Sequence, residues 1–243
     1  MGKVICAGLG PGDPDLMSVR AARAVSAARQ VAYFRKKGRQ GNARRIGEGL
    51  LAEGCIEHAM EYPVTTEIPF DDPRYVDALA NFYDHWAARL VDLVQSEDLV
   101  VLCEGDPFFF GSFMHLYIRL QGQVEVEVIP GITGMTGCWN AAGLPVAWGD
   151  DVCTVLMGTL GEDKLAQHMT MSDTIVVMKT GRNLPKVRRA LATAGRLEEA
   201  WLVERGTMMG ERVVRLVDTD TVDCPYFATV IVAGNGRRPT VGE

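Results

Sequence analysis

Short runs of apolar, often β-branched residues alternate along the chain with longer stretches in which apolar side chains recur every three or four residues. The first pattern predicts buried strands and the second predicts amphipathic helices. The predicted strands are residues 4–9, 30–34, 99–103, 124–129, 153–157, 174–178, 200–204, 212–217 and 227–233. The predicted helices are residues 15–29, 42–53, 75–95, 112–120, 135–142, 164–169 and 184–194. This alternation predicts an α/β fold with mostly parallel, mixed sheets and helices on their faces.

The texture of the chain changes after the Gly-Leu-Pro segment at residues 143–145. We therefore expect two α/β domains, residues 1–143 and 144–243, with a ligand cleft between them, since clefts between domains commonly hold ligands. The last two predicted strands are expected to be hairpin-like. The sequence contains no internal repeat and no low-complexity tract.

The net charge of the 243-residue chain is −6, which argues against a nucleic-acid binder. The charge is uneven, because residues 16–47 contain nine Arg or Lys and no Asp or Glu. This asymmetry indicates either a local anion site or a solvated basic face. The six cysteines form no C-x-x-C pair, so we expect no metal site and no disulfide framework. No apolar stretch resembles a signal peptide or a membrane span, and we expect a cytoplasmic protein.

The glycine-rich segment "GLGPGD" does not fit a dinucleotide-binding loop. Its spacing is G-x-G-x-G, and the window that should carry a ribose-binding acid is wholly basic. The chain also has no phosphate-binding P-loop, no G-x-S-x-G elbow and no H-E-x-x-H motif. The glycines must therefore serve a ligand other than a pyrophosphate, or simply form turns.

A Gly-Asp-Pro triplet follows a predicted strand twice, at residues 12–14 and 105–107. Glycine at a strand end lets backbone groups approach a ligand closely, and Asp106 adds an acceptor. Open α/β sheets bind ligands outside the carboxyl ends of their strands. The pair favours a zwitterionic ligand with hydroxyl groups over a polyphosphate, although each triplet alone could be an ordinary turn.

Four ordered segments resemble motifs of the tetrapyrrole methyltransferases of cobalamin biosynthesis. They are "GLGPGDPDLMSVRAARAV", "CEGDPFFFG", "EVIPGITGM" and "FATVIVAGN", and "VERGTMMGERVVR" is similar to a strand pair of the family's second domain. Within the family, "YFRKKGRQGNAR", "MEYPVTTEI" and "VMKTGRNLP" are most similar to the enzymes that methylate carbon 20 of the macrocycle.

The resemblance implies that S-adenosylmethionine is the methyl donor and that the protein is a homodimer. The residues expected to contact the donor are Pro11, Gly105, Asp106, Phe109, Thr133, Gly134, Met178, Ala228 and Thr229. At Met178 the alignment with the family motif could slip by one residue, which would make Lys179 the contact. The substrate would be a reduced tetrapyrrole bearing many carboxylates. We expect Arg35, Lys36, Lys37 and Arg39 to bind those carboxylates, as Arg can do with two parallel hydrogen bonds.

Methyl transfer from a sulfonium needs alignment of the reacting atoms more than a protein nucleophile. A base that removes the later proton is not identified by the sequence; Tyr62, Glu67, Tyr117 and Glu204 are possible. The three phenylalanines of "DPFFFG" could face the adenine, the macrocycle or the helix core. Three other functions stay open: a methyltransferase for the cobalt-bearing macrocycle, a ribosomal RNA methyltransferase on the same fold, and a non-catalytic tetrapyrrole carrier.

Overall fold

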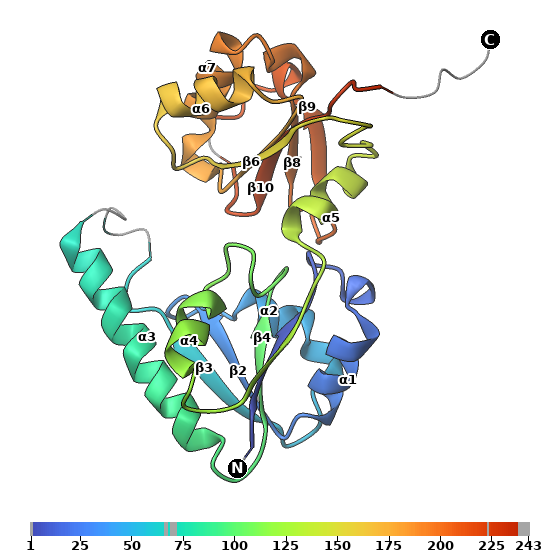
Figure 1. Cartoon of the computed structure of the whole chain (residues 1–243). Helices are drawn as coiled ribbons and strands as arrows, with labels where there is room; N and C mark the ends of the chain where they lie inside the picture. The colour runs from blue at the N-terminus through green and yellow to red at the C-terminus, as the bar shows by residue number, and fades with distance from the viewer. Residues whose placement is uncertain (1, 66–67, 69–71, 223, 238–243) are drawn as a thin grey trace. The chain divides into compact units, whose positions relative to one another are not determined.

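The computed structural model describes residues 2–65, 68, 72–222 and 224–237. The chain divides into two compact units, Met1–Gly134 and Met135–Glu243, each built on one five-stranded sheet (Figure 1). The division lies close to the boundary predicted after residue 143. Helix α5 (Gly134–Ala141) is grouped with the second unit because its Cys138 packs against Val203 and Ile231 there.

The sheet of the first unit is entirely parallel, as the alternating pattern predicts. Its strands run in the order β3-β2-β4-β1-β5, so all five carboxyl ends lie at the same edge. The strands are β1 (Val4–Gly8), β2 (Gln30–Arg35), β3 (Ile56–Glu61), β4 (Leu99–Cys103) and β5 (Val126–Ile129). Strand β3, which the hydrophobic pattern does not predict, is a half-exposed edge strand that carries two glutamates and a histidine.

Two helices cover each face of this sheet (Figure 1). Helices α1 (Val19–Ala27) and α2 (Asn42–Ile46) pack on one face, and α3 (Pro73–Leu93) and α4 (Phe113–Leu120) on the other. Two predicted helices are shorter than expected. The first begins only after Ser18, whose Oγ accepts the backbone N–H of Ala21 and caps the helix. The second ends at Gly47, before a single 3₁₀ turn.

The sheet of the second unit is mixed, with strand order β6-β7-β10-β8-β9. Only β6 (Cys153–Met157) and β7 (Thr174–Met178) pair in parallel. The other three pairings, which involve β8 (Trp201–Glu204), β9 (Arg212–Arg215) and β10 (Ala228–Val232), are antiparallel. The expected hairpin of the last two strands is wrong, because β10 inserts between β7 and β8 while β9 pairs with β8.

Helices α6 (Glu162–Thr170) and α7 (Leu184–Thr193) cover one face of the second sheet and enclose its main apolar core. The smaller cluster around α5 covers the other face. Burial of these apolar faces is the principal stabilising contribution in each unit. The core of each unit thus leaves the strand ends and their loops available for binding.

Candidate cofactor and substrate loops

The two Gly-Asp-Pro loops of the sequence lie side by side at the carboxyl edge of the first sheet. Strands β1 and β4 are neighbours, so the loops that follow them leave the sheet together. Leu9 N–H donates to Cys103 O at 2.8 Å, and Gly105 N–H donates to Gly10 O at 2.7 Å. The return bond, from Gly10 N to Gly105 O, is 3.4 Å long. Both glycines have positive φ, +82° and +67°, which side-chain-bearing residues adopt only with strain.

A third loop, which follows β5, closes against the same two. A Cβ placed on Gly131 would lie 2.1 Å from Gly105 O, and one on Gly8 would lie 2.6 Å from Gly131 N. Only glycine allows this contact of backbone on backbone. Thr133 and Gly134, both expected to contact the donor, come two and three residues after Gly131 and therefore leave the same edge of the sheet.

Asp106 holds these loops together with its carboxylate. Oδ1 accepts the N–H of Phe108 at 2.9 Å, and Oδ2 accepts the N–H of Gly131 at 3.0 Å. Hydrogen bonds to an ionised carboxylate are stronger than those between neutral groups. The motif predicts that Asp106 contacts the ligand; in the structure both of its oxygens fix the loops that present backbone groups at this edge.

The three phenylalanines after Asp106 are not equivalent to core residues. Phe108 and Phe110 are 44% and 47% exposed, so for these two side chains the helix-core alternative is wrong. Phe109 is half-buried and packs edge-on against Phe110, with ring centroids 4.8 Å apart. Pro11, which lies in the first loop, is buried. The loops therefore combine a rigid backbone with accessible aromatic rings.

The four cations expected to bind the substrate begin at the carboxyl end of β2, the strand next to β4. Arg35 is already paired, since its guanidinium lies 3.1–3.2 Å from Glu61 Oε2 at the end of β3. Lys36, Lys37 and Arg39 are exposed. Among the residues that the structure describes, Lys37 and Arg39 form no ion pair, so their charges are available to an anion.

More of the positive charges in the basic stretch, residues 16–47, are paired with carboxylates than the sequence indicates. Arg44 forms a bidentate pair with Glu57, 2.6 and 2.8 Å long, and Arg20 pairs with Glu127 at 2.5 Å. These glutamates come from strands β3 and β5, outside the basic stretch. Among the described residues of the loop after β2, the cations without an ion pair are therefore Lys37 and Arg39, so less of the basic segment is available than its sequence indicates.

Glu104, between β4 and the second Gly-Asp-Pro loop, was not singled out by the sequence analysis. Its Oε2 atom is buried and has no hydrogen-bond partner among the described residues. Burial raises the pKa of Glu104 to about 7, and hydrogen bonding from Asn42 and the charge of Arg45 oppose this rise. The signal that could have found it is a lone acid directly after a run of five buried apolar residues.

In the second unit, the three residues expected to contact the donor lie on neighbouring strands. Met178 ends β7, and Ala228 and Thr229 begin β10, which is paired with β7. Met178 is half-buried; Ala228 and Thr229 are buried, with Thr229 Oγ1 3.5 Å from Cys138 Sγ. Lys179, the alternative to Met178, has φ +54°, and burial lowers its pKa.

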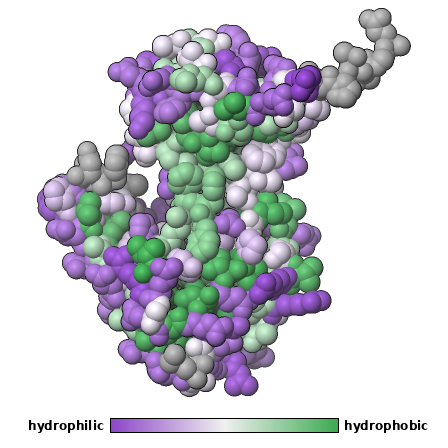
Figure 2. All heavy atoms as spheres, viewed as in Figure 1, coloured by the Kyte–Doolittle hydropathy of each residue, from purple (hydrophilic) through white to green (hydrophobic). Residues whose placement is uncertain are grey.

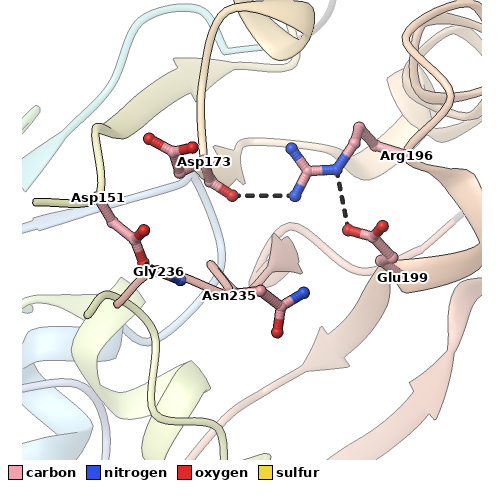
Figure 3. A pocket seen from close by; sticks show the side chains of 6 residues that line it. All are labelled: Asp151, Asp173, Arg196, Glu199, Asn235 and Gly236. Carbon is pink, nitrogen blue, oxygen red and sulfur yellow. Dashed lines mark hydrogen bonds and ion pairs between the residues drawn. The ribbon is translucent and has the colours of Figure 1, made fainter. Parts of the chain in front are cut away.

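A hollow in the second unit contains none of the expected site residues (Figure 3). Arg196 is held there by the carbonyl oxygens of Ser172 and Asp173, at 2.8 and 2.9 Å, and by Glu199 Oε2 at 2.9 Å. Asp151 accepts the N–H of Trp148 at 2.8 Å. Its lining residues are Asp151, Asp173, Arg196, Glu199, Asn235 and Gly236. With its one cation saturated and three carboxylates present, this hollow does not suit a polycarboxylate.

Three of the four possible bases are described, and none stands out. Tyr62 lies with its hydroxyl 2.5 Å from Ser112 Oγ, Tyr117 packs against the rings around α4, and Glu204 is 7% exposed in β8. Glu67 lies outside the described residues. Within the described part of the chain, no group of three or more His, Cys, Asp or Glu side chains could hold a metal ion. No described helix is both long and apolar enough to cross a membrane.

The fold and the four loop motifs define a class of protein. The family model "Tetrapyrrole (Corrin/Porphyrin) Methylases" matches residues 3–219, and the chain belongs to this family. Solved structures agree with the fold. One is a uroporphyrin-III C-methyltransferase from Thermus thermophilus complexed with S-adenosyl homocysteine (TM-score 0.66, 24% identity, covering 95% of this chain and 96% of that one).

Two curated relatives are similar over nearly their whole length. A precorrin-2 C(20)-methyltransferase from Sinorhizobium sp. is 48% identical over 240 residues, covering 98% of each chain. A cobalt-precorrin-2 C(20)-methyltransferase from Salmonella typhimurium is 27% identical over 235 residues, covering 95% of this chain and 96% of its own. The likeness to the first is therefore considerably greater.

Proposed function

We propose that this protein transfers a methyl group from S-adenosylmethionine to carbon 20 of precorrin-2, giving precorrin-3A in cobalamin biosynthesis. The observation that carries the proposal is the 48% identity, over 98% of both chains, to a precorrin-2 C(20)-methyltransferase. The close approach of the loops around Gly10, Gly105 and Gly131 supports it.

The first unit offers a suitable edge for such a donor. Because the loops that follow β1, β4 and β5 pack backbone against backbone at their glycines, a ligand at this edge would meet backbone amides and carbonyls instead of side chains. Backbone amides and carbonyls can hydrogen-bond to the amino-acid part of the donor and to the hydroxyl groups of its ribose. When bound, S-adenosylmethionine supplies a sulfonium methyl group, a strong electrophile with a neutral leaving group.

The residues of the chain then have to hold and orient the acceptor. Carbon 20 forms the new carbon–carbon bond, the sulfur–methyl bond breaks, and the hydrogen on carbon 20 leaves as a proton. Alignment of two bound reactants can supply roughly 7–11 kcal/mol of the barrier, which explains why no protein nucleophile is needed. Lys37 and Arg39 are suited to hold the carboxylates on the rim of the macrocycle.

The proposal is tested by incubating the protein anaerobically with precorrin-2 and S-adenosylmethionine carrying a labelled methyl group. We expect a product one methyl heavier, with the label on carbon 20 by NMR. Label on another carbon, or none on the tetrapyrrole, would refute the proposal.

The relative from Salmonella typhimurium makes the cobalt-bearing macrocycle a second candidate substrate. Metal-free and cobalt-bearing precorrin-2 should be assayed side by side, and we expect the larger kcat/KM with the metal-free compound. Calorimetry with S-adenosylhomocysteine separates both from a carrier, which would not bind it. Labelled ribosomal RNA in place of the tetrapyrrole would reveal an RNA methyltransferase.

We also propose that the active form is a homodimer. Apolar residues reach the surface of the first unit (Figure 2), and Met114 and Ile118 lie one turn apart on α4 with 40% and 62% exposure. Such an apolar stripe favours burial against a second copy. The predicted contribution of residues 62–70 lies partly outside the described residues. Light scattering should give twice the mass of the chain, and less for Ile118→Glu; a monomeric wild type would exclude the dimer.

A further inference from the structure

Two long cationic residues of the second unit have a backbone conformation that suits glycine. Lys179 has φ +54° and Arg205 has φ +51°. This left-handed conformation brings the Cβ atom of an L-residue close to the following carbonyl oxygen, so it is strained for a lysine or an arginine. Such strain persists only where the surrounding structure holds it, and strained residues concentrate at functional sites.

Both residues lie at one edge of the second sheet. Strand β10 runs antiparallel to β7 and to β8, so the ends of β7 and β8 meet the start of β10 at this edge. Lys179 directly follows β7, and Arg205 directly follows β8. Ala228, which is expected to contact the donor, begins β10 between them. The backbones of the two cations are thus separated by two strand spacings, on the order of 10 Å.

Contacts on both sides of Lys179 hold its strained backbone. Gly158 N–H donates to Met178 O at 2.8 Å, and a Cβ placed on Gly158 would lie 2.8 Å from Lys179 O. The buried hydroxyl of Thr180 donates to Ala228 O at 2.7 Å and ties the turn to β10. The backbone of Lys179 therefore cannot relax to a negative φ without breaking these contacts.

The loop after β8 holds Arg205 in a similar way. Its N–H donates to Phe227 O at 2.7 Å, and its carbonyl oxygen accepts the N–H of Met208 at 2.8 Å. The next residue, Gly206, packs against α5, where a Cβ would lie only 2.9 Å from the Cα atom of Cys138. Both cations are therefore presented at the edge by a fixed backbone.

The charges of the two side chains are not compensated within the part of the chain that the structure describes. Both side chains are exposed, and neither forms an ion pair there. The neighbouring Glu204 is paired with Arg212 at 3.4 Å, and Glu211 accepts the N–H of Thr207 at 2.7 Å. Lys179 is covered enough that burial lowers its pKa. A partly desolvated ammonium without an anion beside it gains from binding a carboxylate.

We propose that Lys179 and Arg205 form a second carboxylate-binding seat for the substrate, at this edge of the second sheet. The proposal rests on the proposed function, since the ligand is the polycarboxylate tetrapyrrole. Carboxylates surround the rim of that macrocycle, so two of them can pair with cations that begin two strand spacings apart. The carboxylate of the methyl donor is the poorer candidate, because the donor also carries an ammonium and a sulfonium, which two cations repel.

The strain separates a binding role from support of the fold. Lys179→Gly and Arg205→Gly each remove one charge and the left-handed strain together. We expect each variant to raise the midpoint of thermal unfolding by about 2 °C. Each should also weaken the affinity for precorrin-2 about tenfold, because one charge-assisted pair is lost. Fluorescence quenching under anaerobic conditions measures this affinity, and calorimetry should show an unchanged affinity for S-adenosylhomocysteine.

Three further variants serve as comparisons. Thr207→Gly relieves the same strain, φ +64°, in the loop of Arg205 without removing a charge, so the affinity for precorrin-2 should not change. Lys164→Met removes an exposed cation of α6 that has no ion pair among the described residues, and it should also leave the affinity unchanged. Arg205→Lys keeps the charge but loses the planar fork, so its affinity should fall between those of Arg205→Gly and the wild type.

An unchanged affinity for precorrin-2 in either Gly variant would overturn the inference. Weaker binding of S-adenosylhomocysteine would assign the two cations to the donor instead, and a lowered unfolding midpoint would make them supports of the fold. If the wild type methylates carbon 20 while the Gly variants bind precorrin-2 normally, the inference fails alone. If the wild type binds precorrin-2 without methylating it, the proposed reaction fails while the binding data still decide the role of the two cations. If the wild type does not bind precorrin-2, both fail.

Discussion

The carboxylates that line the hollow of the second unit and the carboxylate of Glu104 in the first unit differ in their hydrogen bonding. In the hollow of the second unit, Asp151 accepts a backbone N–H, Asp173 accepts the N–H of Val152, and Glu199 pairs with Arg196 (Figure 3). In the first unit, Glu104 keeps one buried oxygen without a partner among the described residues. Satisfied carboxylates stabilise local structure, whereas an unsatisfied one costs stability and calls for a functional explanation.

Asp106 and Asp151 make the contrast sharper, because both hold loops that contain glycines. Asp106 ties the loop after β4 to the loop after β5. Asp151 ties the segment before β6 to Gly236, whose N–H lies 3.4 Å from Oδ2. Only the first lies among the expected donor contacts. The same local device can therefore serve a binding edge in one unit and a structural turn in the other.

The largest loss of stability should come from placing a side chain where the glycine loops pack backbone against backbone. Gly131→Ala places a Cβ 2.1 Å from the backbone oxygen of Gly105, which cannot move without breaking its bridge to Gly10. We expect a loss of about 3–5 kcal/mol in the free energy of unfolding, together with loss of S-adenosylhomocysteine binding. Urea unfolding and calorimetry measure the two.

The matched change in the second unit is Gly234→Ala, whose Cβ would lie 2.1 Å from Asp151 Oδ2. A side chain can rotate away, so we expect about 1–2 kcal/mol and no change in ligand affinity. Gly161→Ala, with open space around its Cβ, is the neutral control. Equal losses of unfolding free energy for Gly131→Ala and Gly234→Ala would show that a clash with backbone costs no more than a clash with a side chain.

Hydrophobic patterning located most elements of both sheets. The bounds of β6 and β7 agree with prediction, because continuous apolar runs are bounded there by polar residues and turns. It failed for β3, since an edge strand with Glu57 and Glu61 lacks that signal. This omission also hid the partners of Arg35 and Arg44, so the basic segment looked more available than it is.

The motif positions of the candidate site were accessible from the sequence, but the contacts among them were not. Two Gly-Asp-Pro triplets at strand ends are a local signal; their direct bridge depends on β1 and β4 being neighbours in the sheet. The motif alone predicts that Asp106 contacts the ligand, whereas its bonds to two backbone amides depend on the third loop. Glu104 could be recognised as a candidate only from the burial of its carboxylate, which depends on how the chain packs.

The next largest effect should be on the pH dependence of stability. The pKa of Glu104 is raised to about 7 in the folded chain, from an ordinary value of 4.5. The folded state therefore binds more protons than the unfolded state between these values, and stability must fall as pH rises through that window. The contribution is on the order of 3 kcal/mol.

Glu104→Gln removes this titration, so its unfolding free energy should exceed that of the wild type at pH 8 and approach it at pH 4.5. Urea unfolding at the two pH values provides the measurement, with Glu199→Gln from the hollow as the comparison. A pH-independent difference between Glu104→Gln and wild type would mean that the buried oxygen is solvated in solution.

The smallest expected effect is the difference in stability between the Asn variants of Asp106 and Asp151. Asp106 uses both oxygens, so Asp106→Asn must turn an NH₂ group toward the N–H of Phe108 or Gly131, and we expect a cost of about 1–2 kcal/mol. Asp151 accepts both its bonds at Oδ2, so Asp151→Asn can keep that oxygen in place and should cost about 0.5 kcal/mol. Only Asp106→Asn should also weaken S-adenosylhomocysteine binding, because it loosens the loops at the binding edge. Thermal unfolding and calorimetry on the two variants provide the measurement: a weakened affinity in Asp151→Asn, or an unchanged affinity in Asp106→Asn, would reverse the roles of the two aspartates.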